Sequence, residues 1–203
     1  MNTILVSSIV ISLFHAIIPN HWLPILAIST KEKWGLPKTL ITTFWAALAH
    51  VISTVGIGIA LGLLGYTLDQ TTGKLMNIIA PVVLIFMGAW FIWQHHRHKH
   101  FHIHPGIKKG MSTSRIIGLL VLAMFFSPCL EITSLYFAAG VYGWSLILLI
   151  SLIYACLTIL GMSVWIIIVY RGLLKTNWHK IEHNSGIISG IALIVSGILF
   201  YIF

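Results

Sequence analysis

The sequence is poor in charged residues, and acidic residues are the scarcest of all. Only 8% of its 203 residues are charged, with 12 Lys or Arg against four Asp or Glu, whereas 58% are hydrophobic. A soluble globular domain carries about 25% charged residues, so this composition excludes that class. It also excludes a disordered chain, because such chains are poor in apolar residues. The composition predicts a protein whose solvent is a lipid bilayer.

Cysteine is scarce as well. Cys129 and Cys156 both lie within apolar runs, which excludes a disulfide framework and a zinc site built from cysteines. No basic segment with interleaved aromatic residues lies outside the apolar runs, so the net charge of +8 predicts no nucleic-acid partner. What the sequence has in excess is histidine, with 11 residues.

Apolar runs of about 20 residues, the length that crosses a bilayer, occur six times. We predict an all-α membrane protein with six transmembrane helices over residues 3–28, 39–65, 75–93, 116–139, 144–170 and 185–203. The chain then divides into a first three-helix unit, residues 1–93, a histidine-rich loop, residues 94–115, and a second three-helix unit, residues 116–203. The first and fourth helices contain Pro19 and Pro128, and we expect these prolines to break them.

The distribution of basic residues predicts the orientation. Eleven of the 12 Lys and Arg lie in the connections after the first, third and fifth spans, and only Lys74 lies on the other side. Cytoplasmic loops of membrane proteins carry the excess of Lys and Arg. We therefore expect a protein of the cytoplasmic membrane with both termini outside and the loop 94–115 in the cytoplasm.

The two halves of the chain resemble each other. The sequence LIFMG at residues 84–88 aligns with LIVSG at residues 193–197 at an offset of 109, which also sets Pro19 on Pro128. Chance similarity between apolar helices is the alternative. Because each unit has three helices, the second unit enters the membrane upside down, and we predict two inverted repeats. Transporters of that architecture bind their substrate at the repeat interface near the bilayer midplane.

Four ionisable residues fall inside the predicted helices, namely His15, His21, His50 and Glu131. Such residues are costly in lipid and mark functional sites. At about 1.5 Å per residue, His15, His50 and Glu131 lie near the bilayer midplane, and Cys129 shares that depth. Imidazole together with thiolate or carboxylate suits Zn, Ni, Co or Cu. We predict a metal site of these three histidines with Cys129 or Glu131; hydrogen bonds between helices and a proton relay at Glu131 are the alternatives.

Broken helices would bring these residues together. His15 and His21 are about 120° apart on a regular helix and face one cavity only if the helix opens at Pro19. Pro128 allows the same for Cys129 and Glu131. The residues expected around this site are Pro19, Asn20, Ser127 and Pro128.

The remaining histidines fall on the predicted cytoplasmic side. From residue 96 to residue 104 every second residue is a histidine, so an extended chain would project five imidazoles from one face. Short histidine-rich tracts bind metals, although a solvated basic loop is the alternative. The residues 179–183, HKIEH, fit a zinc-peptidase signature without the catalytic domain that it needs. We predict auxiliary metal contacts at eight histidines, namely His95, His96, His98, His100, His102, His104, His179 and His183. For His179 and His183 the alternative is a helix cap without a ligand role.

Three motifs together resemble a known family. They are FHAIIPNH at residues 14–21, Ala49-His50, and Ser127-Pro128-Cys129, with the histidine-rich loop between them. They are similar to the NicO-type nickel/cobalt exporters and the UreH-like transmembrane family of the LysE superfamily. The resemblance covers the whole chain as a 3+3 arrangement and implies translocation of a divalent transition metal, with His15, His21 and His50 in the matching positions.

The chain departs from this family at one position of the first motif. Asn20 stands where related nickel permeases have an acidic residue before the second histidine. Pro128-Cys129 is also similar to the thiol–disulfide carriers of the same superfamily, which have a second cysteine in the first repeat, where this chain has Asn20.

These observations predict a secondary transporter that exports nickel or cobalt, with zinc or copper as alternatives, by alternating access. No P-loop occurs in the sequence, so an ion gradient would drive transport, and Glu131 is the candidate for proton coupling. The metal is then the substrate, and we expect no cofactor and no catalytic residue. The alternatives are a membrane thiol–disulfide carrier that pairs Cys129 with Cys156, a metal-dependent membrane enzyme and a metallocentre assembly factor. The lipid bilayer is the expected partner, and a homo-oligomer is possible.

Overall fold

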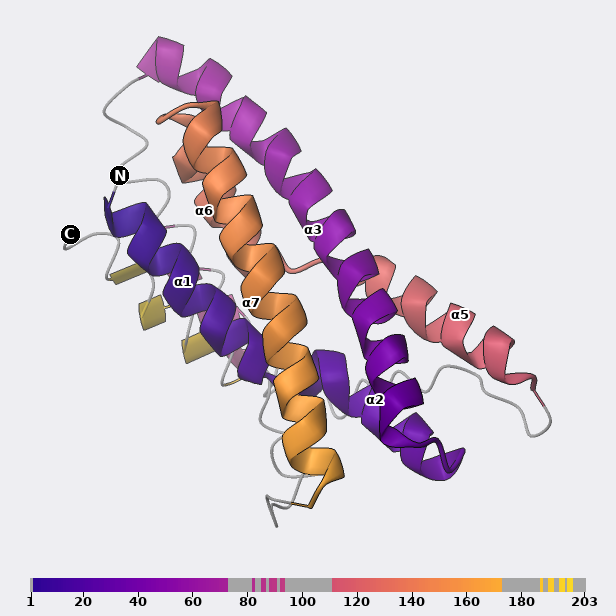
Figure 1. Ribbon diagram of the computed structural model, residues 1–203. Coiled ribbons are helices and arrows are strands. Elements are labelled where there is room, and N and C mark those ends of the chain that lie inside the picture. Colours follow the sequence, from indigo (N-terminus) through magenta and orange to yellow (C-terminus); the bar gives the residue numbers. More distant parts are fainter. Residues whose placement is uncertain are drawn as a thin grey trace.

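The computed structural model describes two continuous stretches, residues 2–72 and 111–172. In addition it describes residues 82, 85–86, 88–90, 92–93, 187, 190–191, 194–195 and 197–198. The continuous helices are α1 (Asn2–Ile17), α2 (Pro19–Lys31), α3 (Leu36–Thr72), α5 (Thr113–Phe125), α6 (Leu130–Gly140) and α7 (Trp144–Tyr170) (Figure 1). No strand occurs among these described residues, so the all-α prediction is confirmed for this part of the chain.

Three helical segments are long and apolar enough to cross a membrane, namely Ile4–Lys31, Leu36–Thr67 and Trp144–Tyr170. They coincide with the first, second and fifth predicted spans. The short apolar helix α5 and the following α6 cover the fourth. The third and sixth spans contain only single described residues, so the six-helix inverted repeat and the division of the chain into units stay predictions.

Two of the predicted spans consist of two helices each. Between α1 and α2, Ile18 is extended, with φ −62° and ψ 125°. Pro19 is the first residue of α2, a position that suits proline because the missing N–H needs no helical partner there. Between α5 and α6, Pro128 and Cys129 lie in a non-helical segment. Both interruptions therefore lie at a proline, and the causal role of the prolines stays a prediction.

Buried apolar side chains form two clusters along the bundle. The first joins α1, α3, α6 and the first half of α7, and includes Ile11, Ile132 and Tyr154. The second joins α2, the first half of α3, α5 and the second half of α7, and includes Trp22 and Met162. The chain passes from α1 to α2, and from α5 to α6, between these two clusters. The two helix interruptions therefore lie in the middle of the bundle.

Glycines bring α3 and α6 close together. A Cβ at Gly58 would lie 2.6–2.7 Å from the ring of Tyr136, and a Cβ at Gly62 would lie 3.2 Å from the Tyr136 carbonyl oxygen. Glycines four residues apart are the pattern that allows helix backbones to approach closely. This contact fixes α6, which directly follows Cys129, against α3, which carries His50.

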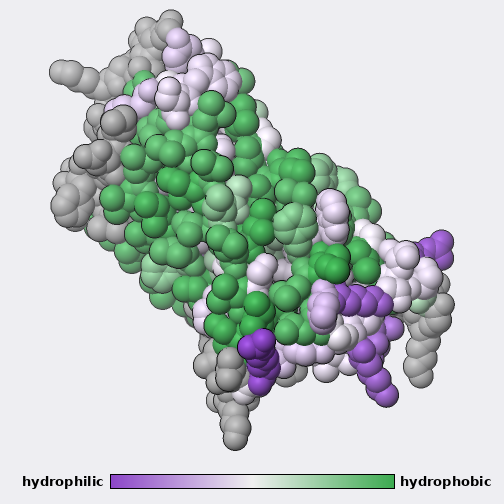
Figure 2. All heavy atoms as spheres, viewed as in Figure 1, coloured by the Kyte–Doolittle hydropathy of each residue, from purple (hydrophilic) through white to green (hydrophobic). Residues whose placement is uncertain are grey.

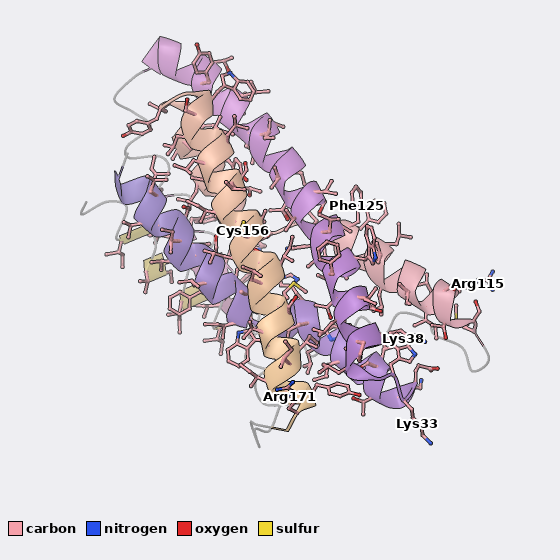
Figure 3. The ribbon with its side chains drawn as sticks, in the orientation of Figure 1. Lys33, Lys38, Arg115, Phe125, Cys156 and Arg171 are labelled. Atoms are coloured by element: carbon pink, nitrogen blue, oxygen red, sulfur yellow. The ribbon has the colours of Figure 1, made fainter. Side chains whose placement is uncertain are left out.

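On the face drawn in Figure 2, apolar side chains cover the middle of the bundle, and the most strongly hydrophilic side chains lie at its lower end. Exposed apolar side chains include Trp45 and Ile52 on α3 and Leu152 and Leu160 on α7. The labelled basic residues lie together at the end where α2 and α7 finish and where α3 and α5 begin (Figure 3); they are Lys33, Lys38, Arg115 and Arg171. An apolar belt with the described basic side chains gathered at one end is compatible with a membrane protein.

Candidate metal centre

His15 and His50 meet in the interior of the bundle. His15 lies close to the end of α1, and His50 lies in the first half of α3. Their Nε2 atoms are 3.1 Å apart, and their rings are stacked at an interplanar angle of 8°. Both side chains are buried, with 2% and 0% of their surface exposed. The distance is that of a hydrogen bond between two ring nitrogens.

His21 completes a group of three imidazoles. Its ring centroid lies 4.5 Å from that of His15 and 4.5 Å from that of His50. One ring nitrogen from each of the three lies within 4.8 Å of the other two. A continuous helix would separate His15 and His21 by about 120°. The extended residue Ile18 redirects the chain between them, and this brings the half-buried His21 to the same point.

Cys129 contacts the same histidine at a different atom. Its Sγ lies 3.3 Å from Nδ1 of His15, whereas Nε2 of that ring faces His50. The backbone N–H of Cys129 donates to Oγ1 of Thr54, one turn after His50 on α3, at 3.0 Å. Cys129 thus links α1, α3 and the start of α6.

Tyr154 reaches the site from α7. Its hydroxyl lies 3.0 Å from Nε2 of His50 and 3.4 Å from Nε2 of His15. Its side chain is fully buried. Neither Tyr154 nor Thr54 was among the site residues predicted from the sequence. The sequence signal for Tyr154 was its place in an apolar helix, because a tyrosine hydroxyl that is buried normally has a hydrogen-bond partner.

Two further polar atoms near the site make no hydrogen bond of good geometry. One is Oγ1 of the buried Thr158, one turn after Tyr154, and the other is Nδ1 of His50. Backbone groups of Met124 and Ser127 lie near the His50 ring. Because nearly all buried polar groups are paired, the clearer exception of the two is Oγ1 of Thr158.

Several predicted site residues contribute no described side chain to the group. Glu131 and Asn20 are the second residues of α6 and α2, and their side chains lie outside the described ones. Ser127 is exposed and Pro128 is half-buried, both in the segment between α5 and α6. The predicted auxiliary ligands all lie outside the described residues; they are His95, His96, His98, His100, His102, His104, His179 and His183.

The two cysteines occupy different environments. They are not joined in a disulfide; Cys129 is buried, whereas Cys156 is exposed on α7 (Figure 3). Cys156 is two residues from Tyr154, which corresponds to a rotation of about 200° around the helix. Since Tyr154 faces the histidines, Cys156 points away from them and from Cys129.

The chemistry of the group suits a transition metal. Imidazole is the most common protein ligand for metals and binds Zn, Cu, Fe and Ni, whereas Mg and Ca prefer oxygen ligands. Three imidazoles from α1, α2 and α3 with a phenol hydroxyl beside them match the first class. No family model, curated protein or solved structure matches this chain.

Proposed function

We propose that this protein is a membrane transporter for a divalent transition-metal cation, which binds between His15, His21 and His50. The observation that supports this proposal is the convergence of three ring nitrogens within 4.8 Å inside an apolar bundle. Burying polar side chains in such a bundle is costly. A hydrogen-bonded contact between two helices needs two of these rings, whereas a cation can use all three.

The position of the site favours transport over storage or catalysis at a surface. The histidines lie between the two apolar clusters, and therefore in the middle of the long axis of the bundle. Three helical segments have the length and composition to cross a bilayer. We place the bilayer around the apolar belt of Figure 2, so that the cation site falls at the midplane, as in secondary transporters.

The directions of the helices support the inverted repeat. α1 and α2 run toward the basic end of the bundle, whereas α5 and α6 run away from it, and α3 and α7 are likewise opposed (Figure 1). Gly88 and Gly190 belong to the third and sixth predicted spans. A Cβ at Gly88 would lie 2.6 Å from the carbonyl oxygen of Gly190, and a Cβ at Gly190 would lie 2.7 Å from the carbonyl oxygen of Gly88. In our proposal these two spans cross at that pair, and the interruptions at Pro19 and Pro128 allow alternating access.

Orientation and direction of transport follow from the basic end. We assign the end with Lys33, Lys38 and Arg115 to the cytoplasm, because excess Lys and Arg mark that side. The histidine-rich loop ends where α5 begins, at the same end, and would collect metal there. We therefore propose export across the cytoplasmic membrane, with nickel or cobalt as the first cations to test. The opposite orientation of Cys156 disfavours a carrier that pairs it with Cys129.

Metal flux into proteoliposomes tests the proposal. The purified chain is reconstituted with a metal-sensitive dye in the lumen, and Ni, Co, Zn, Cu and Mn are compared with and without a pH gradient. We expect flux for the wild type and its loss in His15→Ala and His50→Ala. Tyr136→Phe is the matched control, because it removes a buried hydroxyl that bonds Ser151 rather than the histidines.

The contrary outcomes are distinct. Unchanged flux in both histidine variants at equal protein content would refute the site. Metal binding without flux under any gradient would instead indicate a metallocentre assembly factor.

A further inference from the structure

We infer that Cys129 is not a metal ligand but a positioning residue, which holds the His15 ring from the edge opposite to the cation. This inference rests on the proposed metal site and refines it. The cation then meets nitrogen donors rather than a mixed nitrogen and sulfur set.

The two nitrogens of His15 have different partners. Nδ1 lies 3.3 Å from Sγ of Cys129, whereas Nε2 lies 3.1 Å from Nε2 of His50 and 3.4 Å from the Tyr154 hydroxyl. Metal–nitrogen bonds are about 2.1 Å and metal–sulfur bonds about 2.3 Å, so two such ligands of one ion lie within about 4.4 Å of each other. A sulfur in line with Nδ1 lies beyond that reach from Nε2. Among the described residues, Sγ does not belong to the group of atoms within 4.8 Å.

Cys129 is also held in place. Its N–H donates to Thr54, and its side chain is only 5% exposed. The helix that follows it packs on α3 through Gly58 and Gly62. The Thr54 bond and the packing of α6 hold the backbone of Cys129 in place, so Sγ can change position only by rotation about χ1.

A cation at the Nδ1 edge of His15 is the competing arrangement. It would gain the Cys129 sulfur but lose the position that Nε2 shares with Nε2 of His50, whose ring lies beside that of His21. Metal-binding histidines usually donate their other ring N–H to an outer partner, which fixes the tautomer and the ring orientation. Cys129 occupies that place. Nitrogen donors without thiolate select borderline divalent cations over soft Cu(I).

The absorption spectrum of the Co(II)-loaded full chain in lipid nanodiscs decides between the two arrangements. Visible d–d bands report that Co(II) is bound, and a near-ultraviolet charge-transfer band reports a bond from thiolate to cobalt. We expect d–d bands without the charge-transfer band in the wild type. Cys129→Ala should weaken Co(II) affinity by about 10–100-fold, the usual cost of losing an outer partner, with an unchanged spectrum.

Two variants complete the test. Cys129→Ser keeps a hydroxyl that can bond Nδ1, so it should lose less affinity than Cys129→Ala. Cys156→Ser, the control for the exposed thiol, should match the wild type. A wild-type charge-transfer band that disappears in Cys129→Ser but persists in Cys156→Ser would overturn the inference while leaving the metal site intact.

The remaining outcomes separate the inference from the proposed function. Unchanged Co(II) affinity in folded Cys129→Ala would overturn the positioning role. Absence of any Co(II) binding to the wild type would overturn the proposed function itself. If Cys129→Ala fails to fold, the wild-type spectrum and the affinity of Cys129→Ser decide the question.

Discussion

The Nε2 atoms of His15 and His50 lie 3.1 Å apart, although 35 residues separate these histidines in the chain. The hydroxyl of Tyr154 lies 3.0 Å from the second of these atoms. In this arrangement the two Nε2 atoms and the phenol hydroxyl are hydrogen-bond partners of one another. A cation that binds the same nitrogens must replace these contacts, so metal binding exchanges hydrogen bonds for coordination.

Metal should raise the thermal stability of the protein. A ligand that binds only the folded state at a concentration 100 times its Kd stabilises that state by about 2.7 kcal/mol. We expect Ni, Co or Zn to raise the Tm of the chain in detergent, and EDTA to reverse the shift. Mg should have no effect because the group offers imidazoles rather than carboxylates. The shift should be absent in His50→Ala; an equal shift in that variant would place the metal elsewhere.

Tyr154→Phe should tighten metal binding while it destabilises the metal-free protein. The hydroxyl bonds Nε2 atoms that the cation would use, so its contribution of about 0.5–1.5 kcal/mol favours only the metal-free state. Removing it should raise the apparent affinity several-fold, since about 1.4 kcal/mol corresponds to tenfold. Isothermal titration calorimetry with Ni measures the affinity.

Tyr136→Phe is the control for this experiment, because it loses a buried hydrogen bond to Ser151 without touching a histidine. It should lower the Tm and leave the affinity unchanged. Weaker binding in Tyr154→Phe alone would show that the hydroxyl is a ligand.

The histidines of the site were predictable from the sequence, because an imidazole inside an apolar run is costly and demands a reason. Among the described helices, α7 spans the predicted residues 144–170, whereas α3 (Leu36–Thr72) extends beyond the predicted residues 39–65 at both ends. Tyr154 was not predictable, because a tyrosine in an apolar helix serves equally well as a packing residue. The side chain of Glu131, predicted as a ligand and as the proton-coupling group, lies outside the described ones.

The contact of Cys129 with a particular ring nitrogen was also beyond the sequence. Helical spacing gives the depth of a residue in the bundle, and in that respect Cys129 lies beside His15 as expected. Which edge of the ring it meets depends on how α6 is seated on α3. Close contacts at glycines such as Gly62 set that position. Which backbone atoms a glycine contacts on another helix cannot be predicted from a single sequence.

Gly140→Ala should destabilise the protein. A Cβ at this residue of α6 would overlap the carbonyl oxygen of Gly62 on α3 and lie 2.9 Å from the backbone nitrogen of Tyr66. Both neighbours are backbone atoms, so relief requires the helices to separate, and forced overpacking costs about 1–3 kcal/mol. The measurement is the shift in Tm in detergent.

Gly56→Ala is the matched control, because a Cβ there meets nothing within 4 Å. Alanine should stabilise the helix at that position by about 0.5–1 kcal/mol. Equal Tm values for Gly140→Ala and Gly56→Ala would contradict the close packing of α3 on α6.

The two ends of the bundle should react with thiol reagents from opposite sides of the membrane. Glu32 is exposed at the basic end, and Tyr142 is exposed in the turn before α7 at the other end. In a Cys156→Ser background, Glu32→Cys should react with an impermeant maleimide only in inside-out vesicles, and Tyr142→Cys only in right-side-out vesicles. Glu32 is chosen because its replacement removes no positive charge, so the basic residues that fix the orientation are all kept. Labelling of both positions from one side would refute the spanning arrangement, whereas reversed labelling would place the basic end outside and remove the support for export.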